Sequence, residues 1–427
     1  MAAPAPEPPA SELSDPPLPD PVSRRDPAFG RTLLALTAAG FSTFAILYCV
    51  QPLLPLFTTA FARTPAEASL AVSASTGVLA GAVLIAGVVA DRVERRRMLV
   101  ISLAASAVLT FAVAAAPNWP LLLAARAVTG LALSGVPGVA LTYIAEEMDA
   151  DAVGLAVGLH IAGNVFGGMS GRLATGILAD ALGWRAAVAA VAVVGLASAL
   201  LLRFTLPASR RFRPRRRAVG EALAAYGQTF RDKGLPWLYL QGFLLMGGFV
   251  TVYNYIGFRL LGPPYGLSQT TVGLIFALYL LGVASSPLIG ELAGRVGRRK
   301  VFWAAVLTML AGVALTAARP LGLVIGGVAL LTVGFFGAHS VASSWVARRA
   351  GARRAQAASV YLFFYYLGAS VIGYAGGIAW SARGWGGVAT LLDAVLGLAL
   401  AVGVGLAFLR PLPANAAPAR PPTEQHG

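Results

Sequence analysis

The ionisable side chains that lie inside long apolar stretches of the sequence include Arg126, Arg172, His160 and His339. If such a stretch spans a membrane, a charge at its centre costs about 2.5–3.5 kcal/mol, so each arginine needs a cavity or a partner. A histidine titrates near neutral pH and can carry a proton. For Arg172 the other interpretation is packing near a helix end, and for the histidines it is a hydrogen bond to a neighbouring helix. The chemistry indicated is solute binding and proton transfer.

Enzymatic chemistry would need a nucleophile, a base or metal ligands in a recognisable pattern. The two histidines are far apart and lack the His-Glu-x-x-His or Cys/His spacing of metal sites, and no G-x-x-x-x-G-K-S/T phosphate loop is present. The single cysteine, Cys49, cannot form an intramolecular disulfide. We therefore expect no metal, no cofactor and no enzyme, and an ion gradient as the energy source. A membrane-embedded enzyme or a non-transporting sensor is the remote alternative.

The composition predicts the environment in which these residues act. Hydrophobic residues make up 57% of the 427 residues, charged residues only 12%, and the mean hydropathy is +0.73. Soluble domains carry about 25% charged residues, so this chain is predicted to be a polytopic membrane protein. The formal net charge of +15 lies mostly in short arginine clusters between apolar runs. That distribution is typical of loops that orient membrane spans, and it argues against nucleic-acid binding.

Apolar runs of membrane length recur along the chain. A hydrocarbon core of about 30 Å needs roughly 20 apolar residues per helix, and twelve runs meet that length. They are continuous, without the alternation typical of β-barrel strands. The fold class expected is therefore an all-α membrane protein with twelve transmembrane helices. They cover residues 31–56, 67–90, 98–116, 119–144, 155–179, 185–205, 235–258, 270–293, 300–317, 320–345, 356–380 and 386–409.

The loops between these runs predict the orientation. Clusters of arginine and lysine follow the second, eighth and tenth runs, whereas loops on the other side carry single arginines such as Arg63, Arg185 and Arg319. Positive loops stay in the cytoplasm. We therefore expect a multi-pass protein of a bacterial inner membrane with both termini cytoplasmic.

The sequence also repeats itself. "GVVADRVERRR" begins at Gly87 and "GELAGRVGRRK" begins at Gly290, an offset of 203 residues, but Gly294 stands where the first copy has Asp91. Two homologous halves with a site between them are a transporter architecture. The expected parts are a disordered tail (1–30), a six-helix bundle (31–206), a basic linker with a short amphipathic helix (207–234), a second six-helix bundle (235–410) and a disordered tail (411–427).

These motifs resemble the major facilitator superfamily along essentially the whole chain apart from its tails. The family turn G-x-x-x-D-R/K-x-G-R/K-R/K matches "GVVADRVERR", with Glu94 in place of the second glycine. The R-x-x-x-G motif of helix four matches Arg126 and Gly130, whereas the antiporter motif of helix five matches only in part, since Gly168 replaces its proline. The stretches "FFGAHSVASSWV" and "YLFFYYLGAS" are similar to the arabinose-efflux-permease-like, or drug efflux, branch.

The resemblance implies that the repeated turns gate the cytoplasmic side. In the family the aspartate of the first turn faces the start of helix eleven, which here follows Arg353 and Arg354. We expect the second turn to pair instead with the acidic loop "AEEMDADAVG", where a further acid would be repelled. The predicted gating residues are Gly87, Asp91, Arg92, Arg95, Arg96, Gly290, Arg295, Arg298, Arg299, Glu146 and Glu147.

A central binding site is expected from helices one, four, five, seven, ten and eleven. Aromatic residues with few charges suit a neutral or moderately apolar solute, although packing is the other interpretation of each. The predicted substrate-binding residues are Tyr48, Gln51, Arg126, Asn164, Tyr253, Asn254, His339 and Tyr365, and the proton-coupling candidates are His160, His339 and Asp91.

The function expected from these observations is proton-coupled export of a small organic solute or drug by alternating access. An uptake symporter or facilitator of the same fold is the alternative, because no carboxylate lies at mid-depth in helix one, four or seven. The expected partners are a small-molecule solute, the proton and the lipid bilayer, and the protein is expected to be a monomer.

Overall fold

Helices account for almost all of the regular structure in the computed structural model, which describes residues 19–214 and 219–407. The first half contains α1 to α7, and the second contains α9 to α14, with α8 between them. In the first half the bounds are α1 Ala28–Tyr48, α2 Leu54–Ala60, α3 Pro65–Ala90, α4 Arg95–Ala115, α5 Trp119–Leu133, α6 Pro137–Glu147 and α7 Ala150–Thr205. In the rest they are α8 Val219–Thr229, α9 Leu235–Leu261, α10 Gln269–Leu274, α11 Tyr279–Val296, α12 Arg298–Thr316, α13 Leu321–Ala350 and α14 Arg354–Ala407.

Two of the predicted spans are interrupted by proline. A short 3₁₀ turn, Gln51–Leu53, separates α1 from α2, and Pro52 lies within it. Pro137 opens α6, and three residues separate it from the end of α5 at Leu133. Proline has no backbone N–H to continue a helix, so the chain bends at these points without leaving the apolar run. The bend after α1 leaves helical carbonyl groups inside the protein that need other donors.

Two helices are too long to cross a bilayer once. α7 has 56 residues and α14 has 54, so each is roughly 80 Å of helix against a core of about 30 Å. Both contain a non-helical glycine, Gly183 with φ 81° and Gly384 with φ 57°, where the chain reverses. Glycine is the residue that adopts positive φ without strain.

Within the described residues nine helical stretches are long and apolar enough to cross a membrane. Dividing the two longest of them at Gly183, Gly351 and Gly384 gives twelve segments. An all-α membrane fold is thereby confirmed, and the number of bilayer crossings stays a prediction.

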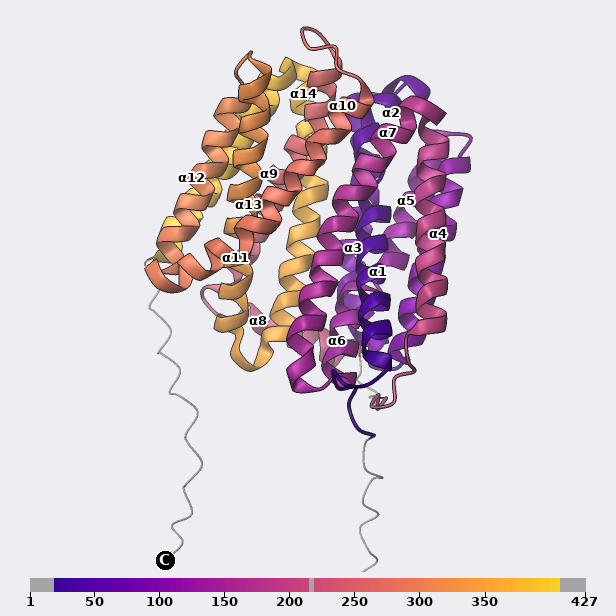
Figure 1. The fold of residues 1–427 in the computed structure, drawn as a ribbon. Helices are drawn as coiled ribbons and strands as arrows, with labels where there is room; N and C mark the ends of the chain where they lie inside the picture. The colour runs from indigo at the N-terminus through magenta and orange to yellow at the C-terminus, as the bar shows by residue number, and fades with distance from the viewer. Residues whose placement is uncertain (1–18, 215–218, 408–427) are drawn as a thin grey trace, which may run out of the picture.

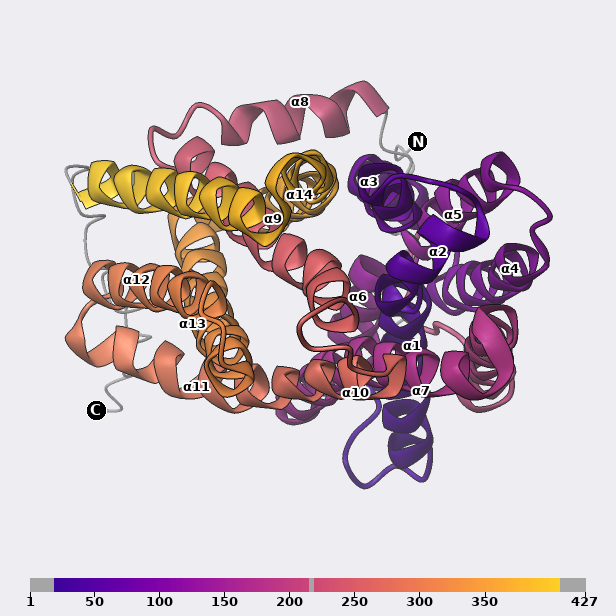
Figure 2. The same cartoon turned by 90° about the horizontal axis from the view of Figure 1, so that it is seen from above.

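The helices form two groups that lie side by side. Figure 2 shows the first half on one side and the second half on the other, with α8 along one edge. Contacts within the halves join α1 to α7 and α9 to α14. Between the halves, α3 lies against α14 and α7 lies against α10 (Figure 2). We call the two ends of the molecule the α10 end and the α8 end, after the helices found there (Figure 1).

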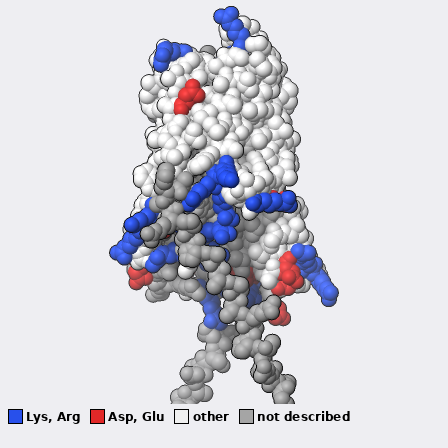
Figure 3. Space-filling model, turned by 90° about the vertical axis from the view of Figure 1, so that its left-hand side faces the viewer, with Lys and Arg blue, Asp and Glu red and all other residues white. Residues whose placement is uncertain are grey.

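The surface supports a membrane environment. In Figure 3 most charged side chains of the visible face lie towards the α8 end, and a broad uncharged zone lies above them. Large apolar side chains on this kind of surface are freely exposed, as shown by Phe204, which is 77% exposed, and Leu182, which is 66% exposed. Contact of such side chains with water is unfavourable, whereas contact with lipid tails is not.

The segments outside the bundles differ in part from the prediction. Residues 19–27 belong to the segment that was expected to be disordered. Here the backbone of Val22 pairs with that of Glu147 and Asp149, at 2.7 and 3.1 Å. The linker contains a helix over Val219–Thr229. Residues 1–18 and the predicted tail 411–427 lie outside the described residues.

Candidate functional site

A cavity of about 480 Å³ lies between the two halves. Side chains of α1, α7, α9, α11, α13 and α14 line it, and most of them are aromatic or aliphatic. Four of the predicted substrate-binding residues are among them: Tyr48, Asn164, His339 and Tyr365. The other lining residues include Phe44, Gly168, Arg172, Met246, Phe249, Tyr279, Phe335 and Phe336.

Arg172 of α7 is the one arginine among the residues that line this cavity. It is 1% exposed, and its Nε donates a hydrogen bond of 2.5 Å to Oε1 of Gln51. Its Nη1 donates at 2.6 Å to the carbonyl oxygen of Gly168. The guanidinium also lies over the rings of Tyr48 and Tyr279, at 4.1 and 4.8 Å from their centres. The structure therefore favours the cavity interpretation of Arg172 over packing alone.

Gln51 and Asn254 join the two halves above this arginine. Nε2 of Gln51 donates a hydrogen bond of 2.7 Å to Oδ1 of Asn254. The two positions differ by 203 residues, which is also the offset between the repeated turns. Equivalent residues of the two halves thus meet each other across the pseudo-twofold axis. Both were predicted to bind substrate, but they close the α10 end of the cavity and do not line its wall.

Tyr253 also lies away from the cavity wall. Its hydroxyl forms a 2.8 Å hydrogen bond with that of Thr332, so the side chain connects α9 to α13. The position is fully buried in aromatic packing against Phe249, Phe276 and Tyr279. The packing interpretation is therefore the better one for this residue.

Among the described glycines, the closest approaches to the backbone of the other half lie towards the α10 end. A Cβ added to Gly176 of α7 would lie 3.0 Å from the Cα of Gly273, and one added to Gly377 of α14 would lie 2.3 Å from the Cα of Ala66. Towards the α8 end, a Cβ added to Gly154 or Gly81 would meet no atom within 4 Å. The structure is thus a state that is closed at the α10 end.

Polar contacts reinforce that closure. Asp180 of α7 accepts hydrogen bonds from the backbone N–H and the hydroxyl of Thr270, at 2.7 and 2.6 Å. Gln269 donates through Nε2 to the carbonyl oxygen of Pro52. Each bond joins one half of the chain to the other.

The two histidines have different surroundings. His339 lines the cavity, and its Nδ1 lies 2.9 Å from the hydroxyl of Tyr361. His160 does not line it; its Nδ1 lies 2.9 Å from the carbonyl oxygen of Leu36 on α1. A carbonyl oxygen only accepts, so Nδ1 of His160 must carry a proton. His339 remains a candidate for proton coupling, and for His160 the bond to a neighbouring helix is the better interpretation.

Arg126 is placed differently from the prediction. It is fully buried and lies outside the cavity. Its guanidinium donates to the carbonyl oxygens of Ala71, Ile46 and Leu47, at 2.7, 3.0 and 2.5 Å. Two of these carbonyls belong to the last turn of α1, where the chain bends before Pro52. Arg126 provides donors for buried carbonyl groups at the end of that helix and does not line the cavity in this structure.

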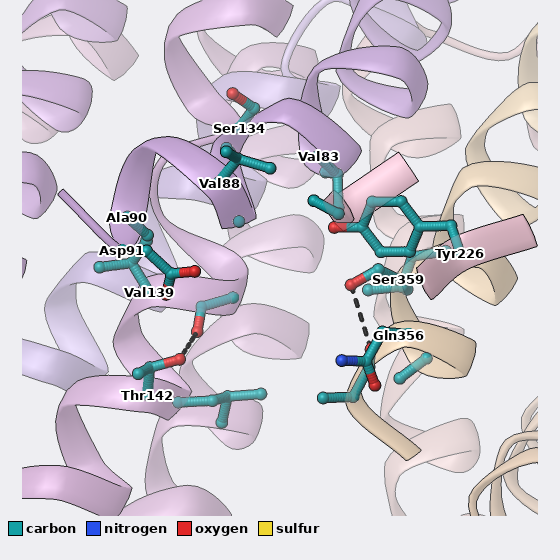
Figure 4. A pocket seen from close by; sticks show the side chains of 18 of the residues that line it. Val83, Val88, Ala90, Asp91, Ser134, Val139, Thr142, Tyr226, Gln356 and Ser359 are labelled. Atoms are coloured by element: carbon teal, nitrogen blue, oxygen red, sulfur yellow. Dashed lines mark hydrogen bonds between the residues drawn. The ribbon is translucent and has the colours of Figure 1, made fainter. Parts of the chain in front are cut away.

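The first repeated turn faces a second pocket at the α8 end. Figure 4 shows Asp91 and Thr142 on one wall, Gln356 and Ser359 of α14 on the opposite wall, and Tyr226 of α8 near them. Asp91 ends α3, its backbone N–H donates to the carbonyl oxygen of Val89, and its carboxylate has no hydrogen bond to any described residue in this state. The start of α14 lies across this pocket from Asp91 without direct contact here, and the gating contact stays a prediction.

Glu94, which replaces the usual glycine of the turn, has a local structural role. Its carboxylate accepts a hydrogen bond of 2.9 Å from the backbone N–H of Arg97 and so caps α4. It also accepts one of 2.9 Å from the N–H of Ser209 in the linker. The equivalent position in the second turn is Gly297, with φ 106°. The first turn thus uses a side-chain cap where the second uses a glycine conformation.

Among the described residues, the acidic residue Glu146 and the second-turn residue Arg295 each pair within their own half in this state. Glu146 accepts two hydrogen bonds from Arg95 of its own half, at 3.1 and 2.9 Å. Oε1 of Glu147 accepts from the backbone N–H of Arg211 at 2.8 Å. Arg295 pairs with Glu291, one turn earlier on α11, at 2.5 Å. Because the α8 end is separated here, the gating roles of these residues stay predictions.

The second half has a different ionic contact at the α8 end. Asp232, which precedes α9, accepts from the N–H groups of Gly234 and Leu235 at 2.8 and 2.9 Å and pairs with Arg349 of α13. Partial burial alone would raise the pKa of Asp232, but these hydrogen bonds and the Arg349 charge outweigh it and lower that pKa.

The sequence was then compared with known proteins. The pattern of the Major Facilitator Superfamily matches residues 36–264 and again residues 259–426. The chain belongs to this family. It is 43% identical over 385 residues to the inner membrane transport protein YnfM of Escherichia coli (strain K12), covering 90% of this chain and 92% of that one. It is 41% identical over 379 residues to the uncharacterized MFS-type transporter YybF of Bacillus subtilis (strain 168), covering 89% and 94%.

A solved structure gives the same fold. The crystal structure of a mutant of the nucleoside transporter NupG superimposes with a TM-score of 0.73 at 16% identity, covering 88% of this chain and 99% of that one. The protein is therefore a multi-pass membrane transporter of a small-molecule solute, with bacterial relatives.

The sequence pattern left the role of Arg172 open between a cavity and packing, and it did not single out the aromatic wall of α9, α11 and α13. The signal for Arg172 was its charge within an apolar run.

Proposed function

We propose that this protein exports a small organic solute or drug in exchange for protons, by alternating access of the central cavity. The observation that carries the proposal is the cavity itself, which lies between two homologous halves whose closest backbone approaches at glycines lie at one end. A rocking movement of the halves would open one end as the other closes. The direction rests on the sequence motifs similar to the efflux branch.

We further propose that the α8 end is cytoplasmic, in a bacterial inner membrane, with both termini on that side. The arginine-rich turns and the linker support this orientation, because positive loops remain in the cytoplasm. The state described above is then inward-facing. A monomer is sufficient for the mechanism, because both halves that form the cavity belong to one chain.

Cysteine labelling tests the orientation. In a Cys49-free background, Ser209→Cys should react only with a reagent that has entered the cell, and Arg319→Cys should react with an impermeant reagent added outside. The expectation follows from their positions at the α8 and α10 ends. Labelling of Ser209→Cys from the outside would reverse the assignment.

His339 is the proposed carrier of the coupled proton, because it is the one histidine among the described residues that line the cavity. In proteoliposomes with an imposed pH gradient, His339→Gln should abolish the gradient-driven component of transport and leave passive exchange. The control His160→Gln removes the other buried histidine and should keep the gradient-driven component. If the double variant still couples transport to pH, the proton is carried elsewhere, and Asp91 or Glu147 becomes the next candidate.

Uptake by symport is a second candidate, favoured by one observation. None of the described residues that line the central cavity is a carboxylate. A carboxylate can bind a proton or a cationic solute but not both at once, and this competition would lead to exchange. A protonated histidine would instead attract an anionic solute, so that the proton and the solute would move together. The same proteoliposomes distinguish the two candidates, since an inwardly directed proton gradient drives accumulation in symport and efflux in exchange.

A further inference from the structure

We propose that the transported solute is a small organic anion, and that Arg172 binds its carboxylate while the aromatic wall holds its apolar body. This inference rests on the proposed transport of a solute through the central cavity but not on the direction of transport. It replaces the neutral solute expected from the sequence. The argument depends on which buried charges are already compensated.

Arg126 is compensated by the protein. Its acceptors at Ile46 and Leu47 lie in the last turn of α1, where the helix dipole places partial negative charge. Its third acceptor is the carbonyl oxygen of Ala71. Arg126 is not among the residues that line the cavity. Arg126 therefore has no need of a solute.

Arg172 is not compensated in the same way. Its two acceptors, an amide oxygen of Gln51 and the carbonyl oxygen of Gly168, are neutral, and Gly168 lies within α7 and not at its end. A guanidinium has five N–H donors, and these two hydrogen bonds use only two of them. Arginine stays charged at any physiological pH. A buried cation at a cavity wall whose acceptors are neutral is a site for an anion.

The remaining wall suits a particular kind of anion. The described lining residues include no aspartate or glutamate, so no acidic side chain of the wall repels a carboxylate. The hydroxyl of Tyr48, whose ring lies under Arg172, is buried without a hydrogen-bond partner among the described residues and offers one more donor. Phe249 and Phe335 stack at 3.9 Å, and with Phe44 and Tyr365 they form an apolar surface. The chemistry fits an aromatic or branched aliphatic monocarboxylate.

Matched probes test the inference on the purified full-length protein in detergent. Indole-3-acetate and benzoate carry the charge; indole-3-acetamide and benzamide have the same shape without it. Binding is measured by calorimetry. We expect each carboxylate to bind at least about tenfold more tightly than its amide, as a charge-assisted bidentate contact implies. Equal affinity of acid and amide, or no binding of either acid at millimolar concentration, overturns the proposal.

Variants assign the preference to Arg172. Arg172→Gln should remove the difference between acid and amide, and Arg172→Lys should keep a weaker preference because it keeps the charge. Arg185→Gln is the matched control: Arg185 donates to the carbonyl oxygen of Ala116, away from the cavity, so its loss should leave the preference intact. A preference that survives in folded Arg172→Gln contradicts the inference. If that variant does not fold, the comparison of acid and amide in the native protein and in Arg172→Lys still decides.

Transport assays separate this inference from the proposed function. If a gradient drives movement of the amides and the acids are not preferred, the proposed transport function stands and the proposed anion site is rejected. If the acids bind tightly and this binding depends on Arg172, but they do not move in proteoliposomes, the proposed anion site stands and transport of these solutes is rejected.

Discussion

Gly176→Leu should strongly reduce transport without unfolding the protein. Gly176 of α7 faces Gly273 of α10, and even a Cβ at position 176 would lie 3.0 Å from the Cα of Gly273. A leucine side chain extends further, so the two halves cannot meet at the α10 end. Overpacking of this kind costs about 1–3 kcal/mol, and the state closed at the α10 end should become at least about fivefold less populated. Because each cycle passes through that state, solute flux in proteoliposomes should fall at least as far.

A cross-link reports the closure directly. Asp180 and Thr270 are joined by hydrogen bonds of 2.7 and 2.6 Å in this state. In a Cys49-free background, the pair Asp180→Cys and Thr270→Cys should cross-link readily, and adding Gly176→Leu should suppress the reaction.

The control for this prediction is an exposed glycine of α13 that faces no neighbour. Gly322→Leu adds the same side chain where nothing lies within 4 Å, so transport and cross-linking should remain close to the native level. Unchanged flux and unchanged cross-linking in Gly176→Leu would show that the α7–α10 contact is not part of the cycle.

The sequence predicted the helices well because their signal is local. Continuous apolar runs and prolines mark the spans, and the 203-residue repeat marks the two halves. The backbone pairing of the N-terminal segment was not predicted, because it depends on a distant part of the chain. Composition alone gives no indication that Val22 would pair with the backbone beside Met148.

The site was only partly predictable, since identical residue types have different roles according to their neighbours. Arg126 and Arg172 are both arginines in apolar runs, and the motif favoured Arg126. The structure shows why the outcome is reversed: Arg126 lies beside the broken end of α1, whereas Arg172 faces a cavity. Which helix end lies beside which side chain is a property of tertiary packing.

The contact between Gln51 and Asn254 shows a similar limit. Their offset of 203 residues identified them as equivalent positions of the two halves. Equivalent residues touch each other only if both lie close to the pseudo-twofold axis at that depth, and the sequence does not record the distance from the axis. They were consequently interpreted as two walls of a site when they form its closed end.

Conformational state adds a further limit. Residues that alternate between partners cannot show both arrangements in one structure. Glu146 pairs with Arg95 here, and Arg295 pairs with Glu291. The pairing that we expect of the second turn belongs to the state closed at the α8 end.

The asymmetry of the two turns can be tested through Asp91. In the present state Asp91 lies across a pocket from Gln356 near the start of α14, and its carboxylate has no hydrogen bond to a described residue. Closing the α8 end should bring its carboxylate to the N-terminus of α14, a contact worth about 0.3–2 kcal/mol. Asp91→Asn should therefore shift the population towards the inward-facing state about twofold to thirtyfold. Val93→Cys and Ala352→Cys, in the two loops that would meet, should then cross-link less.

Gly294→Asp provides the decisive comparison, because it places the acid of the first turn in the second. Gly294 is exposed and a Cβ there meets no atom within 4 Å, so the variant should fold. We expect no rescue when it is combined with Asp91→Asn. In the closed state its carboxylate would face the acidic loop that carries Glu146 and Glu147, where like charges repel, and not a helix N-terminus. Restored cross-linking in the double variant would mean that the two turns are interchangeable, and that the glycine at position 294 does not reflect the charge of the loop opposite.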